Sequence, residues 1–164
     1  MAIMESSSLN KSEIFDPIRQ KWVSASPEEK VRQSLIQQMI EELSYPRELL
    51  SIEKALSEMP HLALASGDLP ERRADIVCFA KGIHPDHFLY PLLLIECKEC
   101  PSLADEAKQQ VIGYNYFIKA CFVAVAYPNG CQWGYYDSKM QAYKFSSFIP
   151  SYQRLMQAVA HARQ

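Results

Sequence analysis

An apolar stripe with helical periodicity follows Ser26. Its members are Val31, Leu35, Ile36, Met39, Ile40 and Leu43. The start of this helix is marked by Ser26 and Pro27, and Glu29 stands three residues after the serine, which is the pattern of a capping box. The Tyr45-Pro46 step disfavours further helix. The pattern therefore predicts a helix that begins at Ser26 and ends near Tyr45.

Later segments alternate between strand-like and helix-like patterns. Strands are predicted over 50–56, 73–80, 91–98, 121–127, 132–137 and 141–145, and helices over 102–118, with Ser102 as its cap, and 151–162. The run at 91–98 is almost continuous in Leu and Ile, as expected for a strand that is covered on both faces. This order predicts an α/β fold with a mixed central β-sheet flanked by helices.

The division of the chain follows from its length and its first residues. A chain of 164 residues suits one domain. Residues 1–13 are polar and rich in Ser, so we expect a flexible N-terminal arm there and a single domain over 14–164.

Polar residues interrupt two predicted strands where the pattern calls for apolar ones. Glu96 and Lys98 follow Leu94 and Ile95, and strand alternation puts them on one face, about 7 Å apart. Asp75 interrupts the preceding strand in the same way. Two carboxylates at one point suit a hard cation such as Mg²⁺, and a lysine beside them can stabilise charge that develops on a phosphoryl oxygen. The alternative is a structural ion pair between Glu96 and Lys98.

Two helices add polar residues to this hypothesis. Glu28 borders the core face of the first helix and lacks a capping role, although an i,i+4 pair with Arg32 is an alternative. Gln110 and Tyr114 lie one turn apart on the second helix, on the side of Val111. We expect both to point inward, where Asp75, Glu96 and Lys98 would supply partners for the amide of Gln110.

Composition narrows the class of protein and its location. The formal net charge of -2 argues against a generic basic coat for nucleic acid, but leaves room for a local basic groove. No apolar run approaches the length of a membrane span, and no secretory signal pattern opens the chain. Five cysteines without a secretory context favour reduced thiols. We therefore expect a cytoplasmic protein that is not associated with a membrane.

The order of these residues resembles the PD-(D/E)XK nuclease superfamily. More closely, the segment 16–137 is similar to the N-terminal nuclease domain of the type I restriction enzyme R subunit. The matching stretches are DPIRQKWVSASPEEKVRQ, EELSYP, RRADIVCF, LLLIECK and QQVIGYN. One departure is Ala74, which stands where the superfamily name has Pro.

The resemblance implies a restriction-endonuclease-like fold and a nuclease that depends on Mg²⁺, with Mn²⁺ as a substitute. By this resemblance Asp75, Glu96 and Glu28 would bind the metal, and Lys98 and Gln110 would join Asp75 and Glu96 in catalysis. Tyr114, with Gln110, would match the motif that positions DNA or the lysine. The substrate would be DNA. Because the resemblance covers no motor domain, we expect a separate DNA-targeting or motor protein as a partner.

Several alternatives stay open from sequence. The chain could be a non-catalytic nucleic-acid-binding or scaffold module that keeps the nuclease fold, or a nuclease that acts on RNA. Arg73 and Lys108 are candidate phosphate contacts, and equally candidates for an ordinary solvated surface. Cys97 and Cys100 have the spacing of a metal or redox pair, but no second pair completes a zinc site, which favours ordinary thiols.

Overall fold

The computed structural model describes residues 12–62 and 67–163. The predicted arm at 1–13 lies outside the described residues except for Ser12 and Glu13, and Glu13 is already the first residue of a strand. Across the described residues, none of the helices is long and apolar enough to cross a membrane.

The observed elements follow the predicted order closely. The helices are α1 (Pro27–Glu41), α2 (Ala104–Ile118) and α3 (Tyr152–Ala162). The strands of the main sheet are β3 (Leu50–Ala55), β4 (Arg73–Lys81), β5 (Leu89–Cys97), β6 (Phe122–Tyr127), β7 (Gly130–Asp137) and β8 (Ala142–Ser147). Ser26 and Ser151 cap α1 and α3 through their side chains, as helix-start residues do.

The six strands form one mixed sheet in the order β3-β4-β5-β6-β7-β8. Only the β5–β6 pair is parallel among these neighbours, and the other pairs are antiparallel. A parallel pair needs a crossover connection, and α2 supplies it. The mixed sheet flanked by helices is confirmed, and the fold is consistent with a restriction-endonuclease-like architecture.

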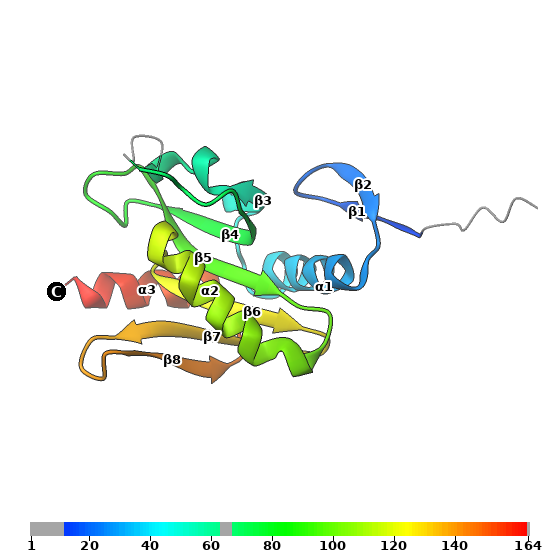
Figure 1. Ribbon diagram of the computed structural model, residues 1–164. Helices are drawn as coiled ribbons and strands as arrows, with labels where there is room; N and C mark the ends of the chain where they lie inside the picture. Colours follow the sequence, from blue (N-terminus) through cyan, green and yellow to red (C-terminus); the bar gives the residue numbers. More distant parts are fainter. Residues whose placement is uncertain (1–11, 63–66, 164) are drawn as a thin grey trace, which may run out of the picture.

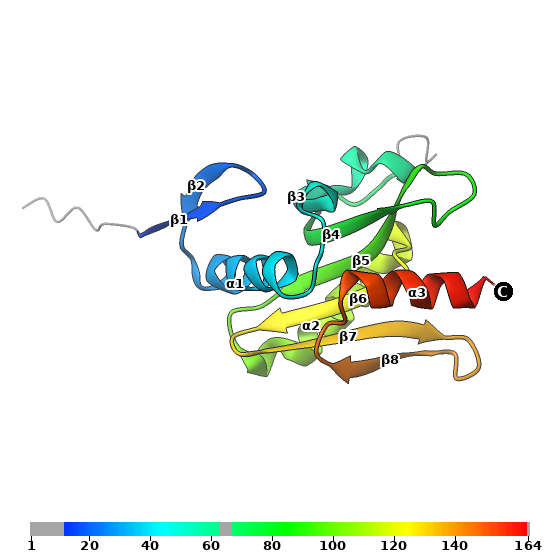
Figure 2. The ribbon, with the colours of Figure 1, turned by 180° about the vertical axis from the view of Figure 1, so that it is seen from behind.

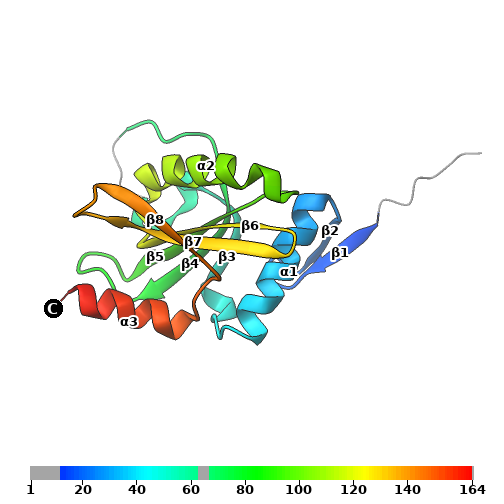
Figure 3. The ribbon, with the colours of Figure 1, turned by 90° about the horizontal axis from the view of Figure 1, so that it is seen from below.

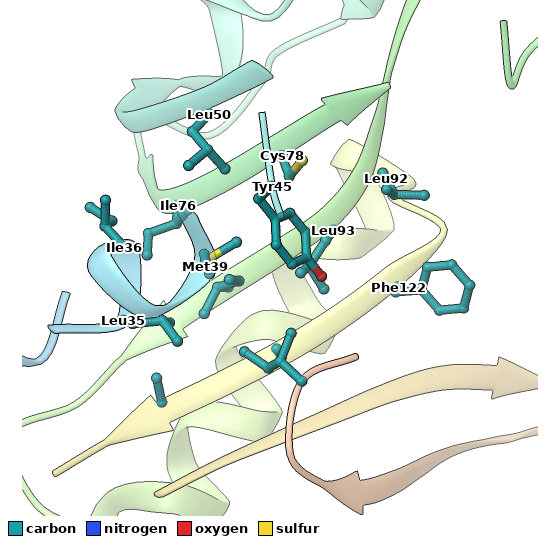
Figure 4. Packing of buried hydrophobic residues seen from close by; sticks show 14 of the residues in the cluster. Leu35, Ile36, Met39, Tyr45, Leu50, Ile76, Cys78, Leu92, Leu93 and Phe122 are labelled. Carbon is teal, nitrogen blue, oxygen red and sulfur yellow. The ribbon is translucent and has the colours of Figure 1, made fainter. Parts of the chain in front are cut away.

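Helices cover both faces of this sheet. Figure 3 shows α2 on one face and α1 with α3 on the other. The pattern along β5 explains the arrangement, because Leu93 and Ile95 belong to the core beneath α1 while Leu94 belongs to the core beneath α2. Figure 4 shows Ile36 and Met39 of α1 against the sheet. The near-continuous apolar run of β5 therefore reflects burial on two sides.

One pair of strands was not predicted, and one predicted helix cap is wrong. A hairpin of β1 (Glu13–Asp16) and β2 (Lys21–Ser24) precedes α1 and lies beside it, away from the main sheet (Figures 1 and 2). Ser102 does not cap α2: a short 3₁₀ turn, Pro101–Leu103, comes first, and the Ser102 hydroxyl lies 3.1 Å from the sulfur of Cys100.

Candidate active site

The candidate site lies where β4 begins and β5 ends. Antiparallel pairing aligns Ile76 of β4 with Ile95 of β5, so the preceding Asp75 lies beside the following Glu96. The backbone N–H of Cys97 donates a hydrogen bond of 2.8 Å to Oδ2 of Asp75. The side chains of Asp75, Glu96 and Lys98 are 17%, 13% and 13% exposed. The structure thus brings these three predicted residues together, half-buried but open to solvent.

Glu96 occupies an environment that disfavours its charge. Burial, and then the charge of Asp75, raise the pKa of Glu96 to about 8, while Lys98 opposes the shift; Glu28 adds to it. The Nζ of Lys98 lies 3.8 Å from Oε1 of Glu96, at the limit of an ion pair. Several carboxylates of α1, β4 and β5 therefore face one another with incomplete compensation, which is the electrostatic setting that a cation would relieve.

Arg32 joins α1 to this site. Its Nη1 donates to Oε2 of Glu29 at 2.6 Å, and its Nη2 donates to Oδ1 of Asp75 at 2.9 Å. Burial alone would lower the pKa of the guanidinium, but Asp75 and then Glu29 raise that pKa above its usual value. The proposed i,i+4 pair between Glu28 and Arg32 is not the one that forms. Glu28 is exposed and acts on the site through its charge.

Glu29 has a different role from the one that the capping pattern predicts. The Ser26 hydroxyl accepts the Glu29 backbone N–H, so half of the capping box is present. The other half is missing, because the Ser26 backbone N–H donates to the carbonyl of Ser24. The Glu29 carboxylate is buried and accepts from Arg19, Arg32 and Gln33. The Glu29 side chain therefore belongs to a network of tertiary contacts and does not complete the capping box.

The polar residues of α2 lie apart from this cluster. The amide of Gln110 donates to Oε1 of Glu106 at 3.2 Å, and both line a cavity of about 520 Å³. Tyr114 lines the same cavity beneath the guanidinium of Arg72, 5.2 Å from the ring centroid. The expectation that Asp75, Glu96 and Lys98 would supply partners to Gln110 is therefore corrected. Ala107 and Val111 face the sheet, and Gln110 lies on the flank of that face.

The two candidate phosphate contacts differ in surroundings. Arg73 is the first residue of β4, exposed, two residues before Asp75. Lys108 lies on α2, where its ammonium is 3.6 Å from Asp105 and 5.2 Å from the ring centroid of Phe145. Of the cysteine pair, Cys97 is buried, Cys100 is half-buried, and both are free thiols.

The donor set suits Mg²⁺ better than zinc. Within residues 12–62 and 67–163, no three His, Cys, Asp or Glu side chains are arranged as a ready metal centre. Mg²⁺ needs only one or two carboxylates, because it keeps several waters and uses the phosphates of the substrate. Asp75 and Glu96 satisfy that smaller requirement, and both are side chains with hard oxygen donors.

A family described as type I restriction enzyme R protein N terminus matches residues 27–150. This chain belongs to that family. No curated protein and no solved structure matched it. The matched range runs from the first residue of α1 to beyond β8 and includes the whole candidate site, whereas the β1–β2 hairpin lies before it and α3 after it.

Sequence reasoning missed the residues that support the site. Helical spacing offers Arg32 to Glu28 as an i,i+4 partner, and no pattern singles out Arg19. The available signal was the position of Arg32 and Gln33 in line with Ile36, on the buried side of α1, where charged residues need partners. The roles of Asp75, Glu96, Lys98, Gln110 and Glu28 in catalysis or metal binding stay predictions.

Proposed function

We propose that this R-protein N-terminal domain is a Mg²⁺-dependent endonuclease that hydrolyses DNA phosphodiester bonds. The observation that carries the proposal is the pairing of β4 with β5, which sets Asp75 beside Glu96 and Lys98 where β4 begins and β5 ends. Membership of a restriction-enzyme family supports a nucleic-acid substrate.

Each residue of the site has a chemical task in this proposal. A bound Mg²⁺ would polarise a phosphodiester oxygen and lower the pKa of the attacking water. Asp75 and Glu96 would hold the ion, and Glu28 would add a carboxylate from the start of α1. The ammonium of Lys98, anchored near Glu96, would stabilise the negative charge that develops on the phosphoryl oxygens.

Residues outside this cluster would bind the substrate. Arg73 is exposed on the strand that carries Asp75, so it would contact a phosphate close to the cleaved bond. On α2, Gln110, Tyr114 and Lys108 would position DNA farther away, since the structure gives Gln110 a partner in Glu106 and not in the acidic cluster. With a net charge of -2, the domain would reach DNA through a separate targeting or motor protein.

The test is cleavage of supercoiled, linear and single-stranded DNA with Mg²⁺ or Mn²⁺. We expect Asp75→Ala and Lys98→Ala each to lower the rate by about 100-fold or more. Lys139→Ala is the matched control, because Lys139 is exposed in the β7–β8 turn. Equal rates in all variants would refute the assigned site. Cleavage of RNA instead of DNA in a parallel reaction would refute the substrate.

A non-catalytic binding module is the second candidate. Its specific support is that both oxygens of Asp75 already accept hydrogen bonds, from Arg32 and from the backbone of Cys97. A carboxylate oxygen has a second lone pair, so these bonds still leave room for a metal. Retarded migration of DNA with no cleavage by the wild type in any metal would favour this module.

A further inference from the structure

A chain of buried ion pairs runs from the β1–β2 hairpin to the candidate site. Arg19 contacts Asp16 within its own turn, reaches Oε1 of Glu29 at 2.5 Å, and lies 3.1 Å from Oε2 of Glu53. Glu29 also forms an ion pair with Arg32, and Arg32 forms a second ion pair with Asp75. The chain of ion pairs thus links the β1–β2 turn to α1 and α1 to β4, and Glu53 of β3 contacts it from the side.

Arg32 is the link on which the geometry depends. Its side chain is 5% exposed. Nη1 binds Glu29 on α1 and lies 3.5 Å from Oε1 of Glu53 on β3, and Nη2 binds Asp75 on β4. With the Cys97 backbone N–H on the other oxygen, the Asp75 carboxylate is held at both ends. Its rotation is therefore fixed by contacts from two sides before any ligand arrives.

Fold stability alone does not account for this arrangement. Burying a guanidinium is costly, and an apolar side chain of similar size often serves the core as well or better. Among the described residues, moreover, Nε of Arg32 is buried without a hydrogen-bond partner. The guanidinium is thus placed to span Glu29 and Asp75, at the expense of its remaining donor.

We propose that Arg32 is a positioning residue that holds the Asp75 carboxylate in the orientation for metal binding, with Glu29 and Arg19 fixing Arg32 in turn. This inference rests on the proposed function, because it assigns Asp75 to the metal. It adds the hairpin to the functional unit, since Arg19 lies between β1 and β2. The hairpin precedes the range that defines the family match.

The metal arm of the test is the affinity for Mn²⁺ in the absence of DNA, measured by calorimetry. We expect Arg32→Lys to weaken Mn²⁺ binding by about 10- to 100-fold, because an ammonium cannot span both carboxylates as the planar fork does. Arg154→Lys, at an exposed position of α3, should bind Mn²⁺ like the wild type. Excess Mn²⁺ should restore much of the cleavage by Arg32→Lys. If Arg32 had a merely structural role, Arg32→Lys would lower the thermal stability of the protein and leave its affinity for Mn²⁺ unchanged.

Glu29→Gln provides a second variant in case Arg32→Lys does not fold. It keeps the size of the side chain but weakens the hold on Arg32, so we expect a smaller loss of Mn²⁺ affinity. Wild-type affinity in a folded Arg32→Lys or Glu29→Gln would overturn the proposal.

The second arm is independent of metal and of activity. In ¹⁵N-edited NMR, a guanidinium whose two Nη groups are held by different carboxylates should give separate, slowly exchanging signals. Asp75→Ala, which removes the acceptor of Arg32 Nη2, should merge the Arg32 Nη signals, and Glu96→Gln should not. Merged signals in the wild type would overturn the positioning role. Absence of Mn²⁺ binding by the wild type would instead contradict the proposed function, while these signals would still decide whether Arg32 orients Asp75.

Discussion

Asp75 and Cys97 are joined by a hydrogen bond of 2.8 Å from the backbone N–H of Cys97 to the Asp75 carboxylate. The bond ties the third residue of β4 to the last residue of β5, so it fixes the distance between the two strands that carry the candidate site. A side chain proposed to bind metal is therefore also part of the strand pairing.

Substitution of Asp75 should consequently affect stability as well as activity. Asp75→Ala removes the acceptor of the Cys97 N–H and one partner of Arg32, and leaving a buried donor unsatisfied costs about 1–3 kcal/mol. Asp75→Asn keeps an acceptor oxygen, so we expect it to unfold at a higher urea concentration than Asp75→Ala. Equal unfolding midpoints would show that the Cys97 contact contributes nothing.

Glu28 and Glu29 are neighbours whose substitution should destabilise the fold to very different extents. Glu29 is buried between Arg19 and Arg32, so Glu29→Ala breaks a buried ion pair and should cost about 3–5 kcal/mol in the free energy of unfolding. Glu28 is exposed, so Glu28→Ala should cost less than about 1 kcal/mol, mainly through the helix dipole. It should nevertheless reduce metal-dependent cleavage.

These two variants control each other, since they lie in the same helical turn and keep the Ser26 cap. Chemical unfolding followed by circular dichroism measures both. A stability loss in Glu28→Ala as large as that in Glu29→Ala would contradict the assignment of Glu29 to the network.

The fold was largely predictable because its signals are local. The apolar run before Glu96 and the stripe of α1 identify buried elements without any tertiary information. The β1–β2 hairpin gives no such signal: each strand has four residues, and Phe15 and Trp22 are exposed on it instead of facing a core. Tertiary contact of Arg19 with Glu29 holds the hairpin in place, and no sequence periodicity encodes that contact.

The candidate site was predictable to a similar extent and for a similar reason. Alternation and interruption of strand patterns identify Asp75, Glu96 and Lys98. Helical spacing allows Arg32 to pair with Glu28 or with Glu29, and the choice depends on Arg19 and Asp75, which are remote in sequence. The partner of Gln110 likewise depends on how α2 is rotated against the sheet, which spacing alone does not determine.

Two glycines should respond in opposite ways to alanine. A Cβ on Gly134 of β7 would lie 2.6 Å from the backbone oxygen of Lys144. We therefore expect Gly134→Ala to lower the free energy of unfolding by about 1–3 kcal/mol through strain. A Cβ on Gly113, within α2, would meet no atom within 4 Å. We therefore expect Gly113→Ala to raise the free energy of unfolding by about 0.5–1 kcal/mol through higher helix propensity. Thermal unfolding decides both, and a stabilised Gly134→Ala would contradict the close β7–β8 packing.

The network at the hairpin should also make the domain sensitive to acid. Burial alone would raise the pKa of Asp16, but hydrogen bonds from the backbone and side chain of Arg19 outweigh it and lower that pKa below its usual range. Because the folded state holds the carboxylate ionised, Asp16 contributes stability above its unfolded pKa of about 4. That contribution is lost as the pH falls through the lower folded pKa.

Comparison with Asp16→Asn isolates this contribution, since every other titrating group is shared. The wild type should be more stable than the variant at pH 7, with a similar difference at pH 5. The difference should shrink below about pH 4, where the unfolded carboxyl takes up its proton before the folded one. Urea unfolding at pH 7, 5 and 3 measures it. A difference that stays constant down to pH 3 would mean that the charge of Asp16 contributes nothing to stability through its contact with Arg19.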